Sequence, residues 1–376
     1  MFLALSEMRR AKTRFGLLAG AVGLLVYLIL FQQALLGGLV EQFIGAVKHQ
    51  SAEVLVFNDQ ARKNLEGSII FPDQLDAVGQ VEGVATAAPL GQDTFTVRAG
   101  GDEQDAAVFG YVLDGPGEPT TVTSGRLPSA PFEAVASSRN AADGFDIGDV
   151  VEVVPAPGTD PVSFTVVGLA SEINYSVSPT LFTDFDSFVA AKRAVNPDAP
   201  TVLASVVAVR VADGASAAGV ADAITAAVPG TEALTRQAAV DESPGVSAVR
   251  SSFSVILLLF YLVVPLVTGL FFLIVTFQKA GALTLLRAIG SPAGPLVRAL
   301  LIQVVAVVLV GGVIATLLFW LTSGATNSLG VTVQAGPVLT TVGVVLALAL
   351  LTSVAAVRRV LRIDPIAATT GAGVQV

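Results

Sequence analysis

Four long stretches of the chain are strongly apolar and almost free of charge. Apolar runs of about 18 residues or more predict transmembrane helices, because a backbone in lipid must satisfy its own hydrogen bonds and a bilayer core takes about 20 helical residues to cross. The first run follows a basic segment, as in a signal peptide, but its length favours an uncleaved anchor. We expect four transmembrane helices, at residues 15–37, 251–277, 296–322 and 337–357.

The segment between the first two predicted spans, residues 38–250, has a different pattern. Short apolar runs bounded by turn residues predict β-strands, and Pro72 with an acidic residue after it predicts the start of a helix. A second helix is expected over the alanine-rich residues 215–228. The strands are predicted at residues 53–57, 94–98, 106–113, 150–154, 164–169 and 202–211. We therefore expect a mixed α/β domain in this segment.

The distribution of charge predicts which side of the membrane each segment faces. Residues 39–250 contain 28 of the 30 acidic residues and 11 of the 21 basic ones, a formal charge of −17, while the rest of the chain carries +8. The other basic residues gather before the first span, between the second and third spans, and after the fourth. Basic segments favour the cytoplasmic side, so we expect cytoplasmic termini and an acidic extracytoplasmic domain whose charge is a solvated surface.

Composition and motifs exclude several kinds of site. The chain has no Cys and a single histidine, His49, which excludes disulfides and thiolate metal centres. It also lacks the phosphate-binding sequence Gly-x-x-x-x-Gly-Lys-(Ser/Thr). We expect no catalytic residue, no metal site, no bound cofactor and no nucleic-acid partner, and we expect His49 to be an interfacial polar residue. The alternative for His49 is a ligand role, for example to a haem iron.

A short amphipathic helix is predicted in the basic segment between the second and third spans. Leu283, Leu286 and Ile289 recur at i, i+3 and i+6 and form one apolar stripe. Gly290 can cap the helix and Pro292 then ends it. Such a stripe cannot be buried in water, so the helix is expected to dock on the bilayer surface or on a partner protein.

In its motifs the chain resembles the FtsX/MacB-type permeases of ABC transporters, over nearly its whole length. The inner-loop motif of that family is matched by residues 286–291, and its basic-then-Asp-Pro tail motif by Arg362, Asp364 and Pro365. Residues 144–153 are similar to a hairpin of the family's outer domain. Many members carry Glu where this chain has Ala282. In lacking this Glu, the chain resembles the branch that includes DevC-like and HrtB-like permeases.

The resemblance implies an α-helical membrane protein with four transmembrane helices and a mixed α/β, MacB-like extracytoplasmic domain between the first and second. It implies a bacterial plasma membrane location, with both termini in the cytoplasm. Besides the four spans and the domain at 38–250, the expected parts are an amphipathic N-terminal helix at 1–14, a coupling loop at 278–295, a short outer loop at 323–336 and a cytoplasmic tail at 358–376.

The same resemblance implies partners and a function. A homodimer of this chain would lie in the bilayer on two copies of an ABC ATPase, which would bind ATP and Mg²⁺; an extracytoplasmic adaptor is a further candidate partner. The dimer would export a hydrophobic or amphipathic molecule (lipid, glycolipid, haem or drug) by mechanotransmission. The alternative is an FtsX-like signal transmitter that regulates an extracytoplasmic cell-wall hydrolase without transport.

Two sets of residues are the predicted functional sites. Residues that would contact the ATPase share the inner-loop helix: Lys279, Leu283, Leu286, Arg287, Ala288, Ile289 and Gly290. Residues that could face cargo between protomers lie near the outer end of the first span: Gln32, Gln33 and His49.

Overall fold

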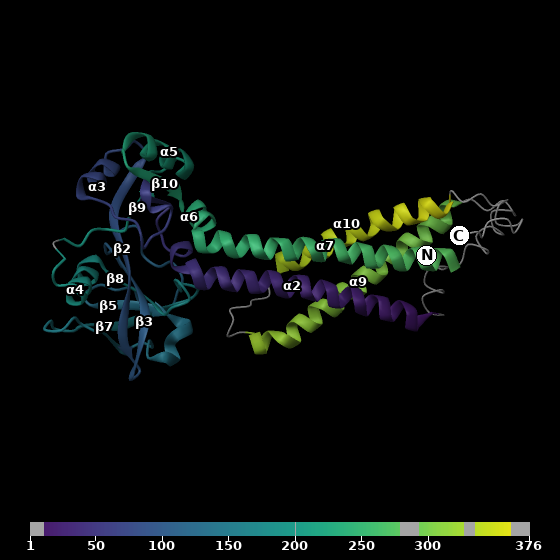
Figure 1. The fold of residues 1–376 in the computed structure, drawn as a ribbon, viewed down its shortest axis with the longest axis horizontal. Coiled ribbons are helices and arrows are strands. Elements are labelled where there is room, and N and C mark those ends of the chain that lie inside the picture. The colour runs from purple at the N-terminus through teal and green to yellow at the C-terminus, as the bar shows by residue number, and fades with distance from the viewer. Residues whose placement is uncertain (1–10, 200, 279–292, 327–334, 362–376) are drawn as a thin grey trace, which may run out of the picture. The chain divides into compact units, whose positions relative to one another are not determined.

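The computed structural model describes residues 11–199, 201–278, 293–326 and 335–361 (Figure 1). Contacts within the chain divide it into two units. The helix unit combines Met1–Gly38 with Ser251–Val376, and the outer domain is Leu39–Arg250.

Long helices build the helix unit. They are α2 (Lys12–Lys48), α7 (Pro244–Gln278), α9 (Ala293–Thr326) and α10 (Ala335–Leu361). Among the described residues, three segments are long and apolar enough to cross a membrane: Lys12–Lys48, Pro244–Phe271 and Leu301–Thr322. α10, where the fourth span is predicted, contains a shorter apolar stretch, Val338–Val354. The count of four spans therefore stays a prediction.

Close contact between α2 and α9 is made possible by glycine. A Cβ on Gly23 would lie 3.0 Å from the carbonyl oxygen of Gly311, and a Cβ on Gly311 would lie 3.1 Å from the amide nitrogen of Gly23. Small residues let two helix backbones approach in a membrane, where van der Waals packing provides much of the association energy. The buried residues around this contact include Val22 and Val26 of α2.

One mixed sheet of ten strands forms the outer domain. Its order is β10-β1-β9-β2-β3-β8-β5-β7-β4, and β6 pairs with β2 and β7. The strands are β1 (Val54–Asn58), β2 (Val84–Ala99), β3 (Asp102–Tyr111), β4 (Val122–Gly125), β5 (Glu133–Ser137), β6 (Val150–Val153), β7 (Val162–Ala170), β8 (Thr180–Asp184), β9 (Val206–Val211) and β10 (Thr231–Thr235). The helices are α3 (Pro72–Gly79), α4 (Phe185–Val195), α5 (Ala217–Ala227) and α6 (Arg236–Glu242), with short 3₁₀ turns η1 (Asp59–Ala61) and η2 (Ser138–Asp143).

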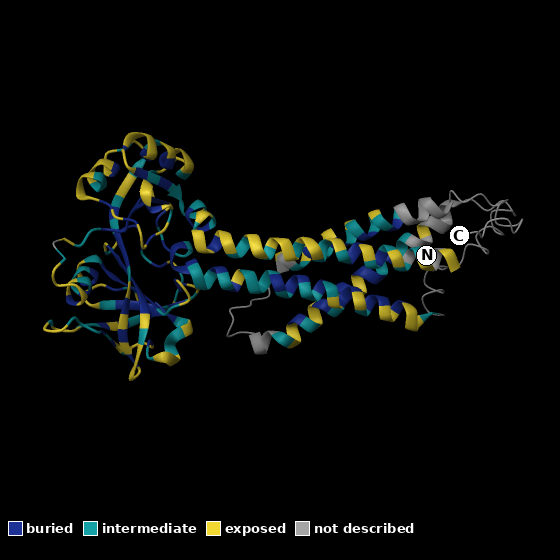
Figure 2. Cartoon of the chain, viewed as in Figure 1, coloured by how far each residue is buried: buried dark blue, intermediate teal, exposed yellow. Residues whose placement is uncertain are grey.

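Strand β2 joins two separate cores. Residues 84–90 pair with β9, whereas residues 91–99 pair with β3. One core lies where β1 and β9 meet α3 and α5, and the other where β2, β3, β5 and β7 meet α4. Figure 2 shows buried residues along the strands and exposed ones on the outer sides of the helices.

Two glycines on β2 and β3 make room for one aromatic ring of α4. Gly91 and Gly110 lie opposite each other in the ladder. A Cβ on Gly91 would lie 2.3 Å from Cε1 of Phe188, and a Cβ on Gly110 would lie 2.3 Å from Cβ of Phe188. The Phe188 side chain is fully buried. The absence of side chains at this glycine pair therefore fixes how closely α4 packs on the sheet.

The predicted strands are all present in the outer domain, with shifted ends, and so are both predicted helices. β2 is 16 residues long, far beyond the predicted residues 94–98. Strands β4, β5, β8 and β10 and helices α4 and α6 were not predicted. α2 continues past the predicted end of the first span, because Ile44 and Val47 of its last turns are buried within the outer domain.

Substitution Gly110→Ala is expected to destabilise the outer domain by about 1–3 kcal/mol, the usual cost of inserting a methyl group into a filled core. Urea unfolding of the full chain in detergent, followed by circular dichroism, measures this. Gly79→Ala is the matched control, because its Cβ would meet only the Ala87 methyl at 3.9 Å. Equal stability of the two variants would contradict the packing described for Phe188.

Candidate functional site

The predicted coupling residues all lie outside the described residues. This holds for the inner-loop residues from Lys279 to Gly290 and for Arg362, Asp364 and Pro365 of the tail. Both assignments stay predictions. The residues predicted near the outer end of the first span, in contrast, are all described.

Gln32 and Gln33 connect helices within the helix unit. The Gln32 amide donates to the carbonyl oxygen of Phe253 at 3.1 Å. Gln33 donates to the Tyr261 hydroxyl at 3.1 Å and accepts from the Thr341 hydroxyl at 3.1 Å. Together these bonds tie α2 to α7 and α10. Burying an amide among apolar helices costs free energy unless it is hydrogen-bonded. The hydrogen bonds of Gln32 and Gln33 therefore give both side chains a structural role. That they face cargo stays a prediction.

His49 directly follows α2 and lies in the outer domain, in a cluster of ionisable side chains at the C-terminal end of that helix. Its Nε2 is 3.0 Å from Oε2 of Glu41 and 3.5 Å from Oε2 of Glu172. Lys48 bonds the other carboxylate oxygen of Glu41. The side chains of Glu41 and His49 are 17% and 19% exposed, and that of Glu172 is 45% exposed. We call Glu41, Lys48, His49 and Glu172 the His49 cluster.

A loop after β7, residues 171–178, brings Glu172 to the cluster by binding the last turns of α2. The amides of Ser176 and Val177 donate to the carbonyl oxygens of Phe43 and Gln42, at 3.0 and 2.9 Å. These backbone bonds hold the loop against the helix independently of any side chain in the cluster.

Glycine at position 45 allows this close approach. A Cβ on Gly45 would lie 2.3 Å from the carbonyl oxygen of Glu172. Glu172 itself has a φ of 59°, in the left-handed region that few non-glycine residues adopt. Next along the loop, Tyr175 is buried edge-on against Phe109 of β3, with ring centroids 5.4 Å apart, and burial raises the pKa of its phenol.

His49 and the loop are each anchored to the sheet region by further polar contacts. The carbonyl oxygen of His49 accepts from both the amide and the hydroxyl of Thr120, at 2.8 and 2.9 Å. Asn174 of the loop is buried; it accepts from the Ser137 hydroxyl at 2.7 Å and donates to Asn140 at 3.0 Å. The backbone on both sides of the cluster is therefore held in place.

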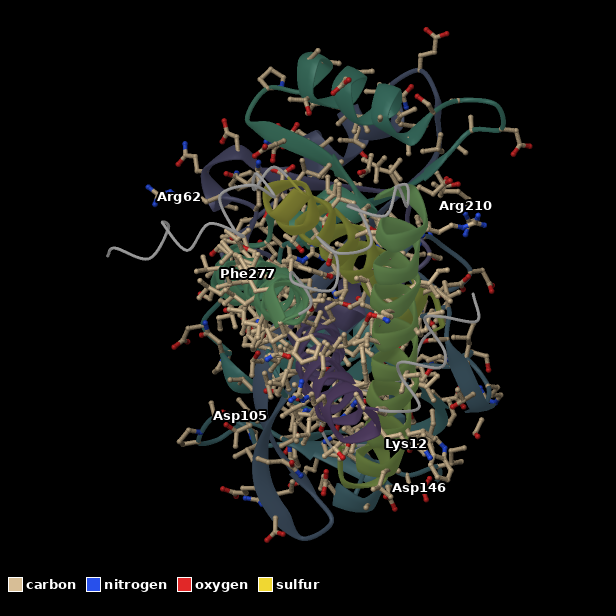
Figure 3. The ribbon with its side chains drawn as sticks, turned by 90° about the vertical axis from the view of Figure 1, so that its right-hand side faces the viewer. Lys12, Arg62, Asp105, Asp146, Arg210 and Phe277 are labelled. Carbon is tan, nitrogen blue, oxygen red and sulfur yellow. The ribbon has the colours of Figure 1, made fainter. Side chains whose placement is uncertain are left out.

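Of this cluster, only His49 was a predicted site residue. Glu41 and Lys48 are seven residues apart, two helical turns, which places them on one face of α2 beside His49. Glu172 was missed, because it is far away in the sequence and comes from an acidic segment in which no spacing distinguishes it. Elsewhere on the domain, Arg62, Asp105, Asp146 and Arg210 are exposed (Figure 3), as expected of solvated surface charge.

Comparison with protein families assigns both parts of the chain. The model described as MacB-like periplasmic core domain matches residues 16–227, and the one described as FtsX-like permease C-terminal matches residues 254–365.

Full-length relatives agree with these matches. The chain is 26% identical over 375 residues to an uncharacterized ABC transporter permease of Mycobacterium tuberculosis, covering 99% of both chains. It is 22% identical over 373 residues to a putative hemin transport system permease protein HrtB of Staphylococcus haemolyticus, again covering 99% of both.

Among solved structures, the periplasmic region of MacB from Actinobacillus actinomycetemcomitans matches with a TM-score of 0.37 and 12% identity, over 51% of this chain and 92% of that one. The extracellular domain of the noncanonic ABC-type transporter YknZ from Gram-positive bacteria matches with a TM-score of 0.34 and 13% identity, over 49% and 100%. At these scores the likenesses add nothing to the family matches.

Substitution Gly45→Ala is expected to displace the loop 171–178 and to lower the free energy of unfolding of the outer domain by about 1–3 kcal/mol. Urea unfolding of the full chain and limited proteolysis of the loop measure the two effects. Gly37→Ala on the same helix is the control, since its Cβ would meet nothing within 4 Å. A Gly45→Ala protein with wild-type stability and an intact loop would disprove the close contact.

Proposed function

Because the chain belongs to the family of permeases that join a MacB-like periplasmic core domain to an FtsX-like C-terminal region, we propose that it is the membrane subunit of an ABC exporter for a hydrophobic or amphipathic molecule. The observation that carries the proposal is the order and extent of the two matches, at residues 16–227 and 254–365, together with 99% coverage of relatives that are ABC transporter permeases. The chain is a membrane protein with an extracytoplasmic domain, and an ABC permease works with a partner ATPase.

Energy for export comes, in this proposal, from the partner. The chain lacks the Gly-x-x-x-x-Gly-Lys-(Ser/Thr) sequence, so ATP and Mg²⁺ bind to two copies of the ATPase. The inner-loop stripe of Leu283, Leu286 and Ile289 supplies apolar area for the ATPase groove, and Arg287 supplies an ionic contact at its rim.

Transmission of the ATPase motion is supported by the continuity of two helices. α2 and α7 each run through the boundary between the helix unit and the outer domain without a break in helical structure. A helix resists bending because its backbone hydrogen bonds repeat along its length; α2 contains no proline, whereas Pro265 removes one of these bonds in α7. In this proposal, movement of the spans is passed to the outer domain along these two helices. This is the mechanotransmission that we propose, and it needs no cargo passage between the spans.

The surface of the helix unit supports a bilayer location and a second copy of the chain. α7 exposes large apolar side chains at intervals of three or four residues along one face: Val255, Leu258, Leu262, Leu266 and Leu270. Figure 2 shows exposed positions along much of this helix. Such a face suits lipid or the matching face of another protomer. We propose a homodimer in the bacterial plasma membrane, with both termini in the cytoplasm on the side of the basic segments.

The cargo class is proposed from chemistry and from relatives. A staphylococcal relative is a putative hemin transport permease, so haem is one candidate, beside lipids, glycolipids and apolar drugs. Gln32, Gln33 and His49 remain the candidate residues to face it. An extracytoplasmic adaptor is a further candidate partner.

Reconstitution with the partner ATPase in lipid nanodiscs tests the proposal. Export predicts that one of these cargo classes stimulates ATP hydrolysis and crosses a proteoliposome membrane in an ATP-dependent way. Stimulation by an extracytoplasmic cell-wall hydrolase, with no cargo movement, would instead support the FtsX-like signal transmitter. Failure of the purified chain to bind any ABC ATPase would overturn both.

Substitution Leu286→Asp is expected to reduce cargo-stimulated ATP hydrolysis by about tenfold or more, because a charge buried in an apolar groove has no partner there. Steady-state ATPase measurements with and without cargo check this. Thr284→Asp is the matched control, since it adds the same charge on the opposite side of the predicted helix. Equal coupling in both variants would reject the assignment of the stripe.

A further inference from the structure

Glu41, His49 and Glu172 of the His49 cluster point their donor atoms toward one another. Ion pairing alone does not require this arrangement. One donor atom each of Glu41, His49 and Glu172 lies within 4.8 Å of the other two. His49 Nε2 is 3.0 Å from the oxygen of Glu41 and 3.5 Å from that of Glu172. Zinc binds imidazole nitrogen and carboxylate oxygen at about 2.0–2.2 Å, so neighbouring donors around a tetrahedral ion are about 3.3–3.5 Å apart. The separation of His49 from Glu172 matches that spacing, and its separation from Glu41 is slightly shorter.

We propose that Glu41, His49 and Glu172 form a binding site for a divalent transition-metal cation, with Zn²⁺ as the ion that fits the donors best. An imidazole with two carboxylates matches the ligands that zinc uses in proteins, whereas calcium and magnesium take oxygen ligands. The site supplies three protein ligands, and the partial exposure of Glu172 leaves water access to a fourth position.

Charge in the cluster favours a cation. Two carboxylates face the imidazole, and Lys48 pairs with one of them by bonding the oxygen of Glu41 that does not approach His49. Lys48 therefore need not be displaced when an ion binds. It orients the Glu41 carboxylate, as groups hydrogen-bonded to metal ligands commonly do.

The backbone around the site is already organised. Glu41 stands on α2, Glu172 on the loop 171–178 that is bonded to Gln42 and Phe43, and the backbone of His49 is held by Thr120. The separations of His49 from the two carboxylates lie within a few tenths of an ångström of the ideal spacing. A bound ion would link the outer end of α2 to the loop. The sequence predicted no metal site, because Glu172 was not expected beside His49.

Zinc binding by the full-length chain in detergent tests the site directly. The protein is produced with a purification tag that contains no histidine, and EDTA removes any bound metal. Zn²⁺ is then titrated into the protein in competition with a chromophoric chelator. The chain has one histidine and no cysteine, so one strongly bound ion per chain is expected, together with a zinc-dependent rise in melting temperature. Absence of stoichiometric binding by the wild-type chain would overturn the proposal.

Two variants separate a metal site from a simple ion-pair cluster. His49→Gln keeps a hydrogen-bonding side chain but removes the imidazole ligand, and it is expected to weaken zinc binding about 100-fold or more and to abolish the thermal shift. Glu172→Gln is expected to weaken zinc binding about tenfold or more. If His49→Gln does not fold, the comparison of Glu172→Gln with the wild type tests the proposal. Glu103→Gln, an exposed residue paired with Arg98, is the control and should bind as the wild type does. Wild-type affinity in His49→Gln or in Glu172→Gln would show that the cluster is held by hydrogen bonds and charge alone.

Discussion

A peptide group in hydrocarbon must find its hydrogen-bond partner within the protein, and the helix unit depends on this constraint. It accounts for the long helices α2, α7, α9 and α10, whose backbones satisfy themselves. It also accounts for the few polar side chains among them. Gln32 and Gln33 of α2 bond to α7 and α10, so the amides serve as links between helices where water is not available to solvate them.

The outer domain meets a different requirement, because it must pack helices and loops closely on a long sheet without lipid around it. Glycine provides the space in two places. Gly91 and Gly110 admit the Phe188 ring of α4, and Gly45 admits the carbonyl of Glu172 at the end of α2. The second contact is the one with functional consequences, since it brings Glu172 to His49. The same packing that fastens the loop to α2 thus assembles the proposed cation site.

The pattern of apolar and polar residues along the chain predicted much of this fold. The apolar runs located α2, α7 and α9, and alternation or β-branched runs located β1, β3, β6, β7 and β9. β5 and β8 were missed because they are buried almost throughout and therefore show no alternation. The first half of β2, rich in alanine with one proline, has weak strand preference, and its pairing with β9 overrides that preference. The sequence placed His49 just beyond the first span but did not predict the His49 cluster, because Glu172 reaches it only through tertiary packing.

The proposed ATPase contact and the proposed cation site must lie on opposite sides of one membrane, so both depend on the topology of the chain. The chain has no cysteine, so a single introduced thiol reports its own location. In intact cells, a membrane-impermeant maleimide should label Asp146→Cys in the outer domain, and should label Arg287→Cys in the inner loop only after the membrane is permeabilised. Labelling of Arg287→Cys in intact cells, with Asp146→Cys protected, would contradict the account.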